Sequence, residues 1–328
     1  MDQATKLRKI VKKVVKKEEK KIVRPNAQVI TVTSGKGGVG KTNFTINLAV
    51  QLANEGKKVV ILDADFGLAN IEVLFGIVPK YTLLDVINGS KIITDILIDG
   101  PNGIKFISGG SGIQELTRLN EKQLNYFIQN LSLLDKMADV ILIDTGAGVS
   151  DTVLTFVKTA DEVVLIATPD PTSVTDAYAL IKILKSKHDE EVKKEKNKNE
   201  DDTDKVKDGE KSEDEKTDQE EIKPIRNDLK LVVNNIRNKE EGEEIADKLK
   251  NVSEKFLELD LEVIGYIPHD EMLQKAVKMQ QPVSIAYPKS SSSKAVAEIS
   301  KHFVKEDEDK SYTGIASFIK KFIFKMSN

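Results

Sequence analysis

The chain has 328 residues, a formal net charge of −3 and no cysteine. This length can hold one large or two ordinary domains with a sizeable buried core. The lack of cysteine excludes disulfides, thiolate metal sites and Fe–S clusters. No apolar run reaches the roughly 18 residues of a transmembrane helix, and the lysine-rich start lacks the apolar core of a signal peptide. These features predict a cytoplasmic protein.

The first region, residues 1–24, is strongly basic, with ten Lys or Arg against three acidic residues. Its apolar residues follow helical spacing, which predicts a basic helix. Pro25 and Asn26 break this pattern, so a folded domain is expected to span 25–310. The apolar stripe consists of Leu7, Ile10, Val11, Val14 and Val15.

The second region alternates short apolar runs with helical segments. Such runs are typical of strands buried on both faces, as in a parallel sheet covered by helices. Helix Asn43–Asn54 is predicted between the first two strands, with Gly56 at the position of a C-cap glycine. The predicted fold is therefore α/β. Its predicted strands are Gln28–Thr33, Lys58–Asp63, Ile104–Ser108, Asp139–Asp144, Glu162–Thr168, Leu229–Val233 and Glu262–Ile267.

An acidic segment, residues 189–223, interrupts this pattern with sixteen acidic residues against nine lysines. It has only three apolar residues, Val192, Val206 and Ile222. Because so few apolar side chains cannot offset the entropy of ordering, the segment is predicted to be a disordered insertion. Strand-like runs resume after it, so it lies within one domain.

The segment Gly35–Thr42 reads GKGGVGKT and matches the phosphate-binding loop G-x-x-x-x-G-K-[ST]. It follows a predicted strand and precedes a predicted helix, which is the required context. Glycines let backbone N–H groups point at phosphate oxygens, and the helix N-terminus adds positive dipole. Lys41 is expected to neutralise phosphate charge, and Thr42 to bind Mg²⁺. The expected nucleotide contacts also include Gly35, Lys36, Gly37, Gly38, Val39 and Gly40.

Aspartates end two of the predicted strands, where ligands bind in open α/β sheets. Asp144 closes one strand and precedes a glycine-rich turn, and Asp63 and Asp65 close another. Their alternation places the last two carboxylates on one side if the extended geometry persists. The sequence therefore predicts Mg²⁺ contacts at this edge.

The tail, residues 311–328, is predicted to form a short amphipathic helix. Lys320 and Lys321 lie toward the side opposite its apolar stripe, which suits an anionic membrane surface. The same stripe would also suit packing against a protein core. It consists of Ile315, Phe318, Ile319, Phe322, Ile323 and Met326.

The second lysine of the loop, Lys36, resembles the deviant Walker A motif of the MinD/ParA class of ATPases. The likeness extends to the Asp63–Asp65 segment, Asp144, and the segments LVVNN and GYIPHD. It implies ATP hydrolysis with Mg²⁺, and a homodimer in which Lys36 reaches the partner's nucleotide. It also implies that Asp65 orients the attacking water and that Asp63 and Asp144 serve the metal. Adenine contacts are implied for Asn234 and Pro268.

The opening DQATKLR and the segments ADFGLANIEVLFG and IDTGAG resemble the FlhG (YlxH) family of flagellar regulators. The family likeness implies a role in flagellar number and location, ATP-dependent membrane association, and contacts with flagellar switch-complex proteins. It also implies stimulation of the FlhF GTPase. The residues that match its FlhF-binding motif are Asp2, Gln3, Ala4, Leu7 and Arg8.

Three alternatives remain open. A MinD-type regulator of the cell-division site is the nearest, although residues 1–24 count against it because MinD begins at the P-loop strand. A ParA-type DNA segregation ATPase would need nucleic-acid binding, which the acidic pI of about 5.9 does not favour. A module that binds nucleotide without hydrolysing it would share the same P-loop.

Overall fold

The computed structural model describes residues 26–65, 70–110, 115–116, 119–204, 229–304 and 312–327. Its centre is one eight-stranded sheet in the order β3-β4-β2-β5-β1-β6-β7-β8. All neighbouring strands are parallel except β3 and β4, which are antiparallel. The strands are β1 (Gln28–Thr33), β2 (Val59–Ala64), β3 (Ile98–Asp99), β4 (Lys105–Ser108), β5 (Val140–Thr145), β6 (Glu162–Ala167), β7 (Leu229–Ile236) and β8 (Leu261–Pro268).

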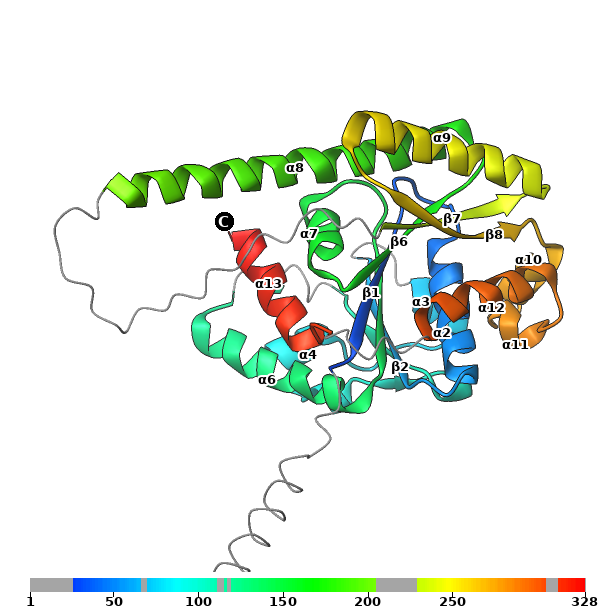
Figure 1. Ribbon diagram of the computed structural model, residues 1–328. Coiled ribbons are helices and arrows are strands. Elements are labelled where there is room, and N and C mark those ends of the chain that lie inside the picture. The colour runs from blue at the N-terminus through cyan, green and yellow to red at the C-terminus, as the bar shows by residue number, and fades with distance from the viewer. Residues whose placement is uncertain are drawn as a thin grey trace, which may run out of the picture.

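Helices cover both faces of the sheet (Figure 1). The helices are α2 (Lys41–Asn54), α3 (Asn70–Phe75), α4 (Leu83–Ile87), α6 (Glu121–Met137), α7 (Asp151–Thr159), α8 (Pro171–Asp204), α9 (Lys239–Leu257), α10 (Glu271–Lys278), α11 (Val283–Ala286), α12 (Ser291–Val304) and α13 (Ile315–Ser327), with short turns η1 (Ile93–Asp95) and η2 (Pro101–Gly103). One core contains residues of α6, α7, α8, α9 and α13, and the other contains residues of α2, α3 and α12.

The central strands lie where the sequence predicts them. Every residue of β1, β2, β5 and β6 is buried, which explains why they read as continuous apolar runs. The predicted α/β fold is confirmed. The edge strand β3 was not predicted, because two residues carry no periodic pattern.

The long helix α8 corrects one prediction. Residues 189–204 were expected to be disordered, but they continue α8, which has 34 residues and spans about 51 Å at ~1.5 Å per residue. Glutamate and lysine are good helix formers, and Lys185 pairs with Asp189 one turn along the helix. Figure 1 shows α8 extending beyond the sheet. The remainder of the predicted insertion, 205–223, lies outside the described residues.

Helix α13 packs on α6 and α7 (Figure 1), and its apolar stripe is buried. The rings of Phe318 and Phe322 stack on Phe156, with centroids 5.8 and 4.4 Å apart. In this conformation, the side chains expected to face lipid therefore belong to the protein core.

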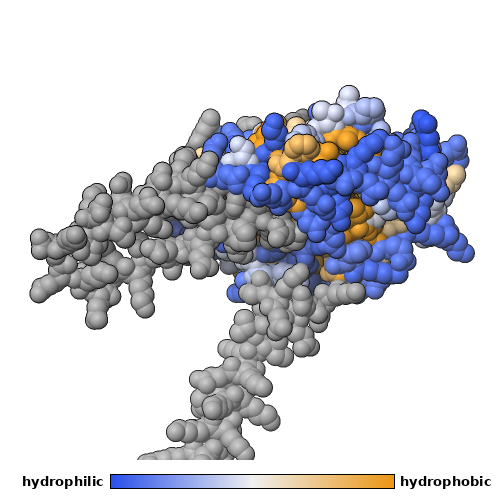
Figure 2. Space-filling view, turned by 45° about the horizontal axis from the view of Figure 1, so that its top comes forward, coloured by the Kyte–Doolittle hydropathy of each residue, from blue (hydrophilic) through white to orange (hydrophobic). Residues whose placement is uncertain are grey.

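The face drawn in Figure 2 is mostly hydrophilic, with apolar side chains gathered in a few places. Among the described residues, no helix combines the length and hydropathy needed to cross a membrane.

Candidate nucleotide site

The phosphate-binding loop connects the end of β1 to the start of α2. Gly40 is the N-cap of α2 with φ of 89°, a left-handed conformation that glycine adopts without strain. A Cβ on Gly35 would lie 2.2 Å from the backbone carbon of Asp176, so α8 approaches the loop too closely for any side chain there. Glycine is therefore needed at position 40 for the left-handed backbone and at position 35 for the close approach of α8, and both glycines also leave room for phosphate.

Lys41 and Thr42 converge on the carboxylate of Asp144. The Lys41 Nζ donates to Oδ1 at 2.8 Å, and the Thr42 hydroxyl donates to Oδ2 at 2.7 Å. Thr45, one helical turn after Lys41, donates to the same Oδ1 at 3.2 Å. Asp144 is fully buried and Lys41 nearly so, so their charges compensate each other in this site.

Asp63 lies next to this cluster, directly opposite Asp144 in the register of β2 and β5. Burial, and secondly the charge of Asp144, raises the pKa of Asp63 to about 7. The backbone N–H groups of Asp65 and Ile71 donate to its two oxygens at 3.1 and 3.4 Å and oppose this rise. Two buried carboxylates and the Thr42 hydroxyl form a set of hard oxygen donors, which fits Mg²⁺.

Asp65 follows the end of β2 and is partly buried. A Cβ on Gly146 would lie 3.6 Å from Asp65 Oδ1, so the carboxylate faces the glycine-rich turn that follows β5. The structure thus places Asp63, Asp65 and Asp144 at one edge of the sheet, as predicted from the strand ends.

Lys36 lies on the other side of the loop. Its Nζ donates to Asp170 Oδ2 at 2.6 Å and to the Thr172 hydroxyl. Because β1 lies between β5 and β6, residues after β5 and after β6 flank the loop on opposite sides. The hydrogen bond from Lys36 is the main cause that lowers the pKa of Asp170. The two lysines of the loop therefore have separate carboxylate partners.

Asn234 and Pro268 lie at the ends of the neighbouring strands β7 and β8. The buried Asn234 amide donates to the Val39 carbonyl at 2.7 Å, which ties β7 to the loop. The His269 Nδ1 is 2.8 Å from the Asn235 Oδ1 at the same edge. The structure brings Asn234 into contact with the loop and places Pro268 at the end of the neighbouring strand, and contact of either residue with a base stays a prediction.

Several residues of this site were missed in the sequence. Thr45 could have been found from its position four residues after Lys41 on the same helix face. Asp170 and Thr172 follow the end of β6, so the strand-end argument applied to them too. The predicted FlhF-binding residues, in contrast, lie outside the described residues, and the predicted membrane residues of α13 lie away from this site.

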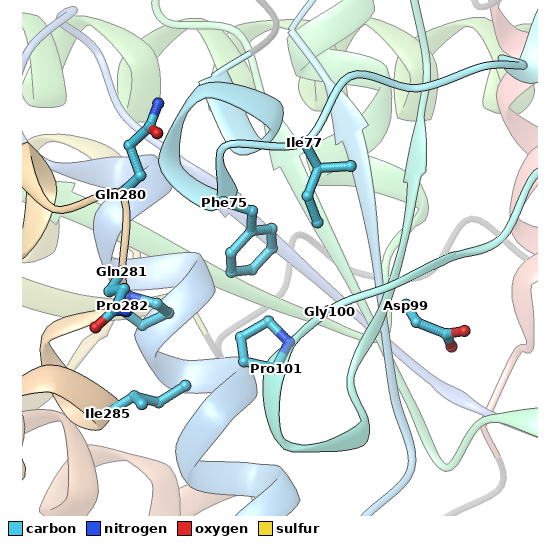
Figure 3. Close-up of a pocket in the computed structure, with 9 residues that line it drawn as sticks. All are labelled: Phe75, Ile77, Asp99, Gly100, Pro101, Gln280, Gln281, Pro282 and Ile285. Carbon is cyan, nitrogen blue, oxygen red and sulfur yellow. The ribbon is translucent and has the colours of Figure 1, made fainter.

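A separate pocket of about 250 Å³ lies where α3, the β3–β4 connection and the turn before α11 meet (Figure 3). It contains no residue of the phosphate-binding loop, so it is not the nucleotide site. Its lining is Phe75, Ile77, Asp99, Gly100, Pro101, Gln280, Gln281, Pro282 and Ile285.

A glycine-rich loop on a parallel sheet, with its lysine and hydroxyl on a strand-end aspartate, defines the P-loop NTPase class. Residues 26–192 match the ParA family model, described as NUBPL iron-transfer P-loop NTPase. The chain has no cysteine with which to ligate iron and sulfur.

Two relatives identify the family to which the chain belongs within this class. The antiactivator FleN of Pseudomonas aeruginosa is 39% identical over 274 residues, 83% of this chain and 85% of FleN. The flagellum site-determining protein YlxH of Helicobacter pylori is 40% identical over 166 residues, 50% of this chain and 56% of that protein. The septum site-determining protein MinD of Pyrococcus horikoshii, complexed with Mg-ADP, has the same fold, with a TM-score of 0.58 and 20% identity over 85% of this chain and 96% of that one. The chain is an ATPase of the MinD/ParA class and belongs to the FlhG (FleN, YlxH) family.

Proposed function

We propose that this ATPase is a nucleotide-dependent switch that regulates the number and location of flagella. Its similarity to FleN and to the flagellum site-determining protein YlxH supports the flagellar role. The switch is supported mainly by one observation, the separation of the two loop lysines: Lys41 binds Asp144, whereas Lys36 binds Asp170 on the opposite side.

The proposed hydrolytic roles follow from the cluster on Asp144. Lys41 and Thr42 exchange that carboxylate for the phosphates of ATP, and Thr42, Asp63 and Asp144 hold Mg²⁺. When bound, Mg²⁺ stabilises the charge that develops on the transferred phosphoryl group. Asp65 orients the attacking water, and Asn234 and Pro268 contact the adenine. An ADP complex of a MinD with the same fold supports the nucleotide and the metal.

Asp65→Ala tests the catalytic assignment directly. Phosphate release should fall at least tenfold, while binding of a fluorescent ATP analogue is retained, because Asp65 is not proposed to hold phosphate. Equal rates of phosphate release in the two proteins would remove Asp65 from the mechanism.

Dimerisation is proposed to depend on Lys36. To reach the nucleotide of a second copy, Lys36 must leave Asp170 and Thr172. Its side chain and that of Asp170 are 37% and 47% exposed, so breaking this pair costs little. ATP then becomes part of the interface between two copies, and hydrolysis weakens the dimer.

Membrane association is proposed to require that α13 leave its site on α6 and α7, because its apolar stripe is buried. In an ATP-bound dimer, two such helices would bind an anionic membrane together, with a gain of roughly 100-fold or more in effective affinity.

Flotation with anionic liposomes tests this proposal, using the double variant Lys320→Glu with Lys325→Glu. Phe318 and Phe322 are unsuitable, since their substitution also disrupts the core. Unchanged flotation would place the anchor elsewhere.

The proposed partners are the FlhF GTPase, through Asp2, Gln3, Ala4, Leu7 and Arg8, and proteins of the flagellar switch complex. GTP turnover by FlhF should rise with a peptide of residues 1–24 and not with its Gln3→Ala variant. If neither peptide acts, the MinD-type alternative, supported by the shared fold, gains weight. DNA binding is not proposed.

A further inference from the structure

The first residues of β1 and the segment before α13 lie side by side, although nearly the whole chain separates them. The Asn26 side chain donates to the Tyr312 carbonyl at 3.4 Å. Gly314 has φ of 72°, and a Cβ there would lie 3.0 Å from the Asn26 Cβ and 2.8 Å from Asp135 Oδ1. The two segments are therefore in direct contact at the amino-terminal edge of the sheet.

Asp135, near the end of α6, binds both segments. Its Oδ1 accepts from the Ile315 N–H at 2.8 Å and its Oδ2 from the Ala316 N–H at 3.4 Å, which caps the first turn of α13. The same carboxylate accepts from the Ala27 N–H, just before β1. Burial raises the pKa of Asp135, and these three donors act against that rise.

Asp161, just before β6, repeats this arrangement. Its Oδ2 accepts from the Val29 N–H at 2.9 Å and its Oδ1 from the Thr313 N–H at 3.0 Å. The Asp161 N–H in turn donates to the Val29 carbonyl at 2.8 Å. Each of the two carboxylates thus joins the start of β1 to the start of α13. We call residues 26–29, 312–316, Asp135 and Asp161 the terminal clasp.

We propose that the terminal clasp couples the two ends of the chain, so that a ligand bound to residues 1–25 weakens the docking of α13. Residues 1–25 join the folded domain at Asn26, so any reorientation of that segment acts first on Asn26 and Ala27. When Ala27 moves away, Asp135 loses a donor and holds the first turn of α13 less firmly. The ten basic residues among residues 1–24 suit a ligand with an acidic surface.

The coupling is reciprocal, because two linked equilibria change each other by the same factor. Release of α13 would therefore raise the affinity of residues 1–25 for that ligand. The inference rests on the proposed function only in taking residues 1–25 as a partner site and α13 as a helix that undocks.

Hydrogen exchange of the α13 amides in the full-length, nucleotide-free protein tests the clasp. Asp135→Asn and Asp161→Asn should each speed this exchange about tenfold, and Asn26→Ala, at an exposed position, about twofold. Asp139→Asn is the matched control: this carboxylate accepts from the Lys58 N–H at 2.7 Å at the same edge, and the Asp139 carbonyl that accepts from the Gln28 N–H of the clasp is kept in the variant. Exchange in α13 that is equally fast in all four variants and the wild type would overturn the clasp.

The coupling is tested with a Fab raised against the peptide 1–24, whose binding is checked by size-exclusion chromatography. The bound Fab should speed α13 exchange at least threefold in the wild type, with no change in the amides of α9. Unchanged α13 exchange with Fab bound would overturn the coupling. Stimulation of FlhF GTP turnover is measured separately. Its failure alongside a Fab effect would refute the proposed partner and leave the coupling standing.

Discussion

Replacing Asp63 with asparagine should stabilise the nucleotide-free protein at pH 8 and at the same time slow ATP hydrolysis. Asp63 is 3% exposed and lies opposite Asp144 on the neighbouring strand. Burial and the charge of Asp144 raise its pKa from 3.8 to about 7. At pH 8 the folded protein therefore contains an ionised carboxylate that its surroundings disfavour.

The size of the effect follows from this shift. A rise from 3.8 to about 7 corresponds to about 4 kcal/mol of lost stability once the group is ionised, at ~1.4 kcal/mol per pKa unit. Asparagine removes the charge but keeps one acceptor oxygen where Asp63 uses two, for the Asp65 and Ile71 N–H groups. Losing one of these bonds costs about 1 kcal/mol. The variant should gain about 2–3 kcal/mol in unfolding free energy at pH 8, or roughly 5–10 °C in Tm.

The direction in which this stability difference changes with pH follows from the raised pKa of Asp63. Because the folded pKa is raised, the stabilising effect of a protonated Asp63 is complete below the unfolded pKa and is lost as pH rises through about 7. The advantage of Asp63→Asn over the wild type should therefore grow by about 1 kcal/mol from pH 6 to pH 8.

Urea denaturation in EDTA without nucleotide, at pH 6, 7 and 8, measures this difference. Asp260→Asn is the control, since that side chain is 66% exposed, and it should change the unfolding free energy by less than about 0.5 kcal/mol. An advantage of Asp63→Asn that is the same at all three pH values would refute the reasoning. So would a variant that is less stable than the wild type at pH 8.

Three further predictions concern other parts of the molecule. Lys36→Ala should bind ATP but fail to dimerise with it in analytical ultracentrifugation, and a persistent dimer would contradict the cross-interface role. Phe322→Ala should lower the unfolding free energy by about 3–5 kcal/mol because it leaves a cavity against Phe156, whereas Phe324→Ala, at a 64% exposed position, should change it by less than about 1 kcal/mol. Thr45→Val should cost about 1 kcal/mol in chemical denaturation because it removes a buried hydroxyl that donates to Asp144; an unchanged midpoint would mean that this bond contributes nothing net.

The sequence predicted those features that depend on local pattern. Continuous apolar runs identified the central strands, because strands covered on both faces need no polar alternation. The P-loop motif located the phosphate site, and the strand ends located Asp63 and Asp144. Thr45 was missed although it lies one helical turn after Lys41 on the same face of α2, so its contact with Asp144 follows once Lys41 is expected to face that carboxylate.

Whether α13 packs against lipid or against the protein core could not be predicted from its own residues. Spacing of Ile315, Phe318 and Phe322 shows that the helix has one apolar side, but lipid and protein cores favour the same side chains. The structure shows Phe156 of α7 as the ring on which two of them stack. Similarly, the composition of 189–204 gave no apolar face, so its helical continuation from α8 had no periodic signal.

The position of β1 has a consequence for communication across the molecule. This strand runs from the terminal clasp directly into the phosphate-binding loop, and its six residues span about 20 Å at ~3.3 Å per residue. It is paired on both sides, by β5 and β6, and is fully buried. A strand held in this way resists bending, and a shift along its axis would break its hydrogen bonds to β5 and β6, so the clasp and the loop are held at a fixed separation. The end of the molecule proposed to meet partners and the end that contains the phosphate-binding loop are thus connected by one continuous buried strand, with no loop between them.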